Sequence, residues 1–109
     1  MRILFDNGTP RGLARLLAGR SVDEARMHGW EEIENGKLID AAELAGFEVP
    51  VTTDKNIRYQ QNLTERKIAL VVLEHSQWPM VKLVAARIVA AVNAARPGSY
   101  IEVEVPFKE

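Results

Sequence analysis

The sequence contains no cysteine and only two histidines among its 109 residues. The missing cysteines exclude disulfide bonds, thiolate zinc sites and cysteine nucleophiles, and two histidines are too few for a histidine-rich metal centre. Any metal would have to be a hard cation held by oxygen ligands. An excess of charge of one sign is also lacking, because 14 basic residues face 15 acidic ones. No global field therefore attracts nucleic acid or an anionic membrane, and any such attraction has to be local.

Long apolar runs are absent as well. The most apolar stretch, residues 83–95, is well short of the roughly 20 residues that a membrane-spanning helix needs. An apolar run begins at the first residues with no signal-peptide pattern, which predicts a cytoplasmic protein without a membrane partner. The hydrophobic fraction of 47% and the charged fraction of 27% are those of an ordinary globular protein. The length predicts one domain over residues 1–109.

Short runs of branched apolar residues predict buried strands, and amphipathic segments between them predict helices. The strands are expected at residues 3–5, 21–25, 49–52, 68–73 and 100–105. The helices are expected at residues 10–17, 35–45 and 80–96. This alternation predicts an α/β fold, namely a three-layer α/β/α sandwich with a mainly parallel sheet. Such sheets bind ligands beyond the carboxyl ends of their strands.

Two aspartates follow strands that are expected in the middle of the sheet. Asp6 comes directly after the first strand, and Asp54 follows the central one. Magnesium and manganese prefer oxygen ligands, and paired aspartates can hold such an ion beside a phosphate. Asp54 can equally be a turn or capping residue. Asp6 is not needed as a helix cap, because Thr9 is expected to cap the helix that follows it. Thr52 and Thr53 could orient metal ligands by hydrogen bonding, or simply fill space in the strand.

Three segments resemble the small PIN-like domains found beside toxin–antitoxin operons. They are Arg2–Pro10 (RILFDNGTP), Asn35–Ile39 (NGKLI) and Val51–Asn56 (VTTDKN). The resemblance covers roughly residues 1–75. PIN domains are magnesium- or manganese-dependent ribonucleases with a three-layer α/β fold, and several are the toxin halves of toxin–antitoxin pairs. The resemblance therefore implies a divalent-metal-dependent ribonuclease that acts on RNA and has an antitoxin-like partner.

On the positions of the family motif, the resemblance makes Asp6 and Asp54 the catalytic, metal-binding aspartates. Related domains carry further acids at three positions where this sequence has the amides Asn7, Asn35 and Asn56. An amide oxygen can still bind a hard cation, but it brings no charge and cannot act as a general base. The amides leave a second hypothesis open, a catalytically degenerate PIN-like domain that binds RNA or a protein. A receiver-type phosphoacceptor domain fits less well, because the adjacent N-terminal acids that would hold its magnesium are missing.

Two helix carboxylates and one basic stretch offer further contacts. Asp40 and Glu43 could replace a lost metal ligand, or lie on a solvated helix face. Lys55 and Arg58 could bind a phosphate backbone while Tyr59 stacks on a base. The same three residues could also belong to a solvated loop.

The remaining features bear on packing and on partners. The acidic segment 23–34 is either a solvated edge or a docking surface for a basic partner such as an antitoxin. Trp30 and Trp78 are expected to pack in the core. The helix at 80–96 is apolar on more than one side, which leaves room for a homodimer through it.

Overall fold

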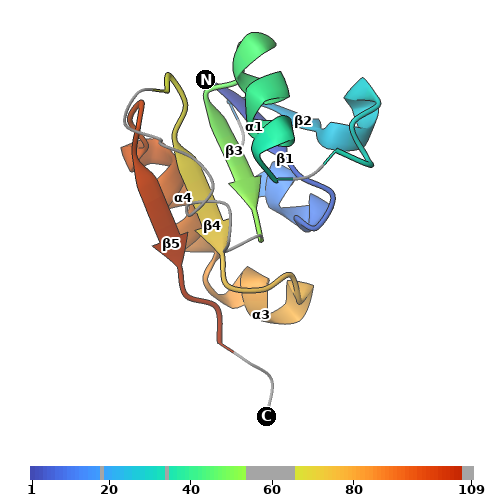
Figure 1. The fold of residues 1–109 in the computed structure, drawn as a ribbon. Coiled ribbons are helices and arrows are strands. Elements are labelled where there is room, and N and C mark those ends of the chain that lie inside the picture. The colour runs from blue at the N-terminus through green and yellow to red at the C-terminus, as the bar shows by residue number, and fades with distance from the viewer. Residues whose placement is uncertain (18, 34, 54–65, 107–109) are drawn as a thin grey trace.

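Five short parallel strands form one sheet in the order β2-β1-β3-β4-β5 (Figure 1). The strands are β1 (Arg2–Phe5), β2 (Ser21–Glu24), β3 (Val49–Thr52), β4 (Leu70–Leu73) and β5 (Tyr100–Val103). The structure is a computed structural model that describes residues 1–17, 19–33, 35–53 and 66–106. The predicted α/β fold is confirmed, and the described strands are parallel throughout.

Helices cover both faces of this sheet (Figure 1). The 3-10 helix η1 (Arg11–Leu17) and the helices α3 (Trp78–Leu83) and α4 (Ala85–Ala94) share one core cluster with Phe5 and Val71. On the opposite face, η2 (Ala25–His28) and α1 (Asn35–Leu44) pack against Leu4, Leu70 and Val72. Neighbouring residues of one strand point to opposite faces, so Leu4 and Phe5 serve different layers. These clusters make up the predicted three-layer sandwich.

The central strands are buried on both faces. Every residue of β3 and of β4 is buried, as expected for parallel strands between two helical layers. Each fully buried Leu, Ile or Phe side chain contributes about 1.5–3 kcal/mol of stability. The packing of both layers thereby fixes where β1 and β3 end, which is where the candidate site lies.

The strand order reverses between β1 and β3. The chain passes from β1 outward to β2, and then returns to pair β3 with the other side of β1. The two connections lie on opposite faces, because η1 packs on one face and α1 on the other. A crevice at the carboxyl ends of the strands is expected at such a reversal, which directs attention to the residues after Phe5 and after Thr52.

Several predicted elements differ in detail. The prediction of a single helix at 80–96 is wrong, because α3 ends at Leu83 and α4 begins at Ala85. Val84 separates them, since it leaves the helical conformation with φ −110° and ψ 20°. Pro79 fits the first turn of α3, which lets this helix begin two residues early. The helix at 10–17 is a 3-10 helix, with its first turn closed by Leu13 N–H on the carbonyl of Pro10 at 3.2 Å.

Both tryptophans pack against the core as predicted. Trp78 is partly buried against the cluster under η1, α3 and α4, and Trp30 against the cluster under α1. Trp30 also stacks on His28, with ring centroids 4.7 Å apart. Within the ranges that the structure describes, no helix has the length and apolarity required to cross a bilayer.

Candidate functional site

The carboxylate of Asp6 accepts hydrogen bonds from three groups at the switch in strand order. Oδ1 accepts from the N–H of Gly8 at 3.1 Å and from the hydroxyl of Thr9 at 2.7 Å. Oδ2 accepts from the hydroxyl of Thr52, at the end of β3. The N–H of Asp6 donates to the carbonyl of Val51 at 3.1 Å. Asp6 therefore joins the loop after β1 to the end of β3 through both its backbone and its side chain.

Burial explains why the two threonine hydroxyls turn to this carboxylate. Thr9 is 6% exposed and Thr52 is 3% exposed, so neither hydroxyl has ready access to water. A buried hydroxyl without a partner costs about 1–3 kcal/mol, and a carboxylate is a strong acceptor. Thr52 makes a hydrogen bond to Asp6, as one of its two predicted roles requires. The single proton of the Thr9 hydroxyl is shared between Oδ1 of Asp6 and the carbonyl of Val51, each 2.7 Å from Oγ1, which differs from the predicted role of a helix cap.

Gly8 allows the loop after β1 to lie directly against the end of β3. A Cβ atom added to Gly8 would lie 2.8 Å from Oγ1 of Thr53, and 3.7 Å from Oδ1 of Asp6. Real Cβ atoms almost never approach another heavy atom within 3.0 Å. A glycine at this position thus brings the hydroxyl of Thr53 and the carboxylate of Asp6 to one place.

Asn7 faces the loop that follows η2. Its Nδ2 donates to the carbonyl of Glu31 at 2.8 Å, and it lies 3.5 Å from the carbonyl of Trp30. The amide N–H groups of Asn7 therefore hold the connection between β2 and α1 against the loop after β1. Asn35 is the first residue of α1, the element to which this connection leads.

The other predicted site residues lie outside the described part of the chain. They are Asp54, Lys55, Asn56, Arg58 and Tyr59. Among the residues that are described, no three histidine, aspartate or glutamate side chains gather where they could hold a metal ion. The structure thus brings together Asp6, Thr9, Thr52 and Thr53, with Asn7 beside them.

Asp40 and Glu43 do not join this site, and the hypothesis that they replace a lost metal ligand is wrong. Asp40 Oδ1 lies 2.6 Å from Nη2 of Arg66, and Glu43 Oε1 lies 3.3 Å from its Nη1. Glu43 Oε2 also accepts the N–H of Lys67 at 2.8 Å. Both carboxylates therefore fix the chain before β4 to α1. This pairing could not be predicted from local patterns, because Arg66 lies 23 residues from Glu43 and 26 from Asp40 in the chain.

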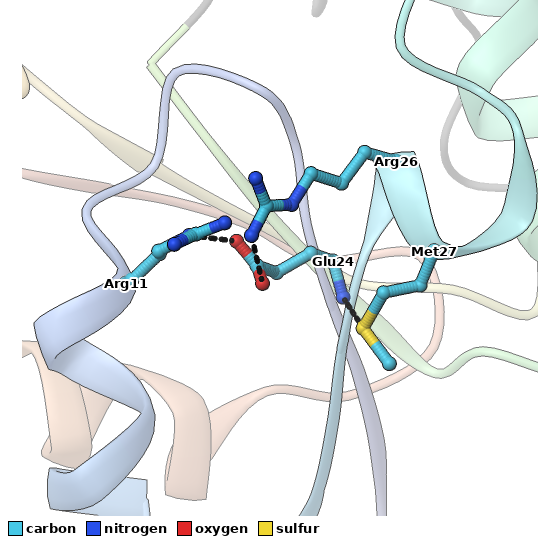
Figure 2. A network of polar contacts seen from close by, with 4 residues as sticks. All are labelled: Arg11, Glu24, Arg26 and Met27. Atoms are coloured by element: carbon cyan, nitrogen blue, oxygen red, sulfur yellow. Dashed lines mark hydrogen bonds and ion pairs between the residues drawn. The ribbon is translucent and has the colours of Figure 1, made fainter.

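A second charged cluster, which the sequence patterns did not predict, lies at the end of β2 (Figure 2). Oε1 of Glu24 lies 2.9 Å from Nε of Arg11, and Oε2 lies 3.5 Å from Nη2 of Arg26. Glu24 is the register partner of Phe5, so the cluster lies one strand away from Asp6. Glu24 and Arg26 are near in the chain, but the contact between Arg11 and Glu24 could not be predicted, because it depends on how η1 packs beside the end of β2.

This cluster connects three elements. Arg11 opens η1, Glu24 ends β2 and Arg26 lies in η2. The N–H of Glu24 also donates to the sulfur of Met27 at 3.3 Å, which closes the first turn of η2 (Figure 2). The side chains of Arg11 and Arg26 are more than half exposed, so this cluster lies at the surface, at the same edge of the sheet as Asp6.

No protein-family model, curated protein or solved structure matches the chain.

Proposed function

We propose that the chain is a PIN-like, divalent-metal-dependent ribonuclease of the toxin type that acts in the cytoplasm. The observation that supports this proposal is the position of Asp6. Its carboxylate lies beyond the ends of β1 and β3, at the reversal of strand order, and the hydroxyls of Thr9 and Thr52 fix its orientation. Ligands of open α/β sheets bind at such a reversal.

The one described carboxylate of the proposed site, that of Asp6, suits a hard cation. A carboxylate offers about four acceptor positions, and the bonds from Gly8, Thr9 and Thr52 use three of them. One position on Oδ2 is then available for a cation or for a water bound to it. We propose Asp6 and Asp54 as the charged ligands of Mg²⁺ or Mn²⁺. The amides Asn7, Asn35 and Asn56 would complete the set or orient substrate.

A bound divalent ion would polarise a scissile phosphate and lower the pKa of a bound water. The chain's own residues prepare the site for this ion. Thr9 and Thr52 hold the Asp6 carboxylate in one orientation, and Asn7 fixes the adjoining loop. We propose that Lys55 and Arg58 contact the phosphates of RNA, and that Tyr59 stacks on a base.

The alternative proposal is a degenerate PIN-like domain that binds RNA or a protein. One observation favours it: the amide of Asn7, at a position where related domains carry an acid, donates to the carbonyl of Glu31 and so serves the loop. The partners of such a module would be RNA, or a basic antitoxin-like protein at the acidic segment 23–34. A homodimer through residues 80–96 is a further proposal, and the 70% exposure of Leu83 supports it.

Calorimetric titration of manganese into the metal-stripped protein tests the proposal. We expect saturable binding that is lost in Asp6→Asn and in Asp54→Asn. Asp40→Asn is the matched control, because it removes a carboxylate that is held by Arg66 instead. No binding at millimolar manganese, or equal binding by all three variants, would contradict the metal site.

Cleavage of single-stranded RNA distinguishes the two proposals. A ribonuclease degrades it with manganese, and Asp6→Asn abolishes the reaction. RNA that is bound but left intact by the wild-type protein would favour the degenerate module.

A further inference from the structure

A groove runs between α4 and the edge strand β5. Two cavities of about 420 Å³ and 560 Å³ form it, and they adjoin each other because Arg87 and Glu104 line both. Its floor between the helix and the strand consists of Ala91, Ile101 and Val103, and its helical wall carries Ala90 and Ala94. β5 has β4 as its one neighbour in the described sheet, so no described strand pairs with its other side.

The backbone of β5 is arranged to receive a further strand on that side. The carbonyls of Ser99 and Val103 accept the N–H groups of Leu70 and Glu74, so they point toward β4. Peptide groups alternate in direction along a parallel strand. The N–H and the carbonyl of Glu102 therefore point away from β4, toward that other side.

The side chains around the groove define what it accepts. Ala90 and Ala94 lie one turn apart on α4, and their small side chains leave the space that the larger cavity occupies. Among the residues that the structure describes, Glu74, Glu102 and Glu104 line the groove together with the cation of Arg87, so this described lining is negative. A partner needs an apolar side chain for the alanine wall and basic side chains for the glutamates.

We propose that this groove binds an extended, basic peptide segment of another protein, which adds a strand beside β5. Main-chain hydrogen bonds to Glu102 give affinity, and an apolar side chain between Ala90 and Ala94 gives specificity. A second copy of the chain is a less favourable partner for this groove. Pairing β5 with its own copy would bring the glutamates of the two strands close together, and like charges opposite each other destabilise a strand pair. The groove is separate from Asp6, so the proposal does not depend on the ribonuclease.

The test uses a fluorescent synthetic heptapeptide in which lysine and valine alternate. We expect saturable binding by fluorescence anisotropy, with NMR shift changes confined to β5 and α4. Ala94→Leu fills the groove and Glu102→Lys neutralises the net charge of its described lining, and each should weaken binding at least about tenfold. The matched controls are Ala86→Leu, an exposed alanine on the same helix outside the groove, and Glu32→Lys, an exposed glutamate elsewhere.

Each other result counts against the proposal. Absence of saturable binding overturns it, and so does binding that both groove variants retain. A peptide with methylated backbone nitrogens cannot pair with β5, so equal binding of that peptide would also overturn it. If Ala94→Leu fails to fold, the comparison of peptide binding by Glu102→Lys, a substitution at an exposed residue, with binding by Glu32→Lys still tests the proposal. A dimer in sedimentation equilibrium that Ala94→Leu abolishes would assign the groove to a second copy instead.

Discussion

The hydroxyl of Thr52 donates a hydrogen bond to Oδ2 of Asp6, which joins the ends of two neighbouring strands across 46 positions of sequence. Thr52 is buried, so this bond replaces the water that its hydroxyl would otherwise bind. The carboxylate that is proposed to hold a metal ion therefore also holds β3 against the loop after β1. A substitution of Asp6 is therefore expected to change both the stability of the fold and the proposed metal binding.

Asp6→Ala should destabilise the fold by about 1–2 kcal/mol, because it removes the carboxylate that accepts from the hydroxyls of Thr9 and Thr52, although Thr9 still has the carbonyl of Val51 as an acceptor. Asp6→Asn should cost about 1 kcal/mol, since the amide oxygen still accepts one of these bonds. Urea unfolding measures both values, with Glu32→Ala as the control at an exposed acid. If Asp6→Ala unfolds at the same urea concentration as the control, the hydrogen bonds contribute nothing to stability.

Thr52→Val should weaken manganese binding while leaving the shape of the side chain nearly unchanged. The substitution removes the donor that orients Oδ2 of Asp6, and loss of such a supporting bond typically costs about 10–100-fold in metal affinity. Thr52→Ser keeps the hydroxyl and should restore most of the affinity. Calorimetric titration compares the two variants. Equal affinity in both would mean that Thr52 supports the strands alone.

Gly12→Ala should destabilise the protein by about 1–3 kcal/mol through overpacking. A Cβ atom at Gly12 would lie 2.5 Å from Cζ2 of Trp78 and 2.7 Å from its Cη2, and the ring is packed against the core. Adding Trp78→Leu removes the obstacle, so Gly12→Ala should cost much less in that background. The coupling energy from urea unfolding of the four proteins checks this. Additive costs would show that the ring moves aside freely.

Local patterns in the sequence were enough to predict the layers and the parallel sheet. The runs around Leu4, Val51 and Val71 are short, branched and apolar, and they become strands because both of their faces are buried. The boundaries depend on contacts between distant parts of the chain. Nothing near Val84 in the sequence marks the end of α3, since this residue leaves the helical conformation while its side chain stays buried.

The candidate site likewise combines residues that local sequence patterns single out with contacts that depend on the fold. Asp6 could be singled out because it follows a strand, and Thr52 could be expected to orient it. The hydrogen bonds of Asn7 to the loop after η2 could not be predicted, because they depend on how the connection between β2 and α1 folds back. The pairing of Asp40 and Glu43 with Arg66 was missed for a similar reason.

The two carboxylates that hold Arg66 differ in what they contribute. Asp40 makes the shorter contact, 2.6 Å against 3.3 Å for Glu43, so distance alone would rank Asp40 first. The side chain of Asp40 is 60% exposed and that of Glu43 is 30% exposed, which means that water screens the Asp40 pair more strongly. Glu43 also accepts the N–H of Lys67 at 2.8 Å.

We therefore expect Glu43→Ala to destabilise the fold by about 1 kcal/mol and Asp40→Ala by less than about 0.5 kcal/mol. Alanine is the better helix former in both places, and this gain is larger for the replacement of aspartate, which widens the difference. Urea unfolding at low and at high salt measures it. The larger part of the Glu43 cost should survive high salt, because salt screens a backbone hydrogen bond less than an exposed ion pair. The opposite ranking would mean that the short Asp40 contact holds the chain before β4.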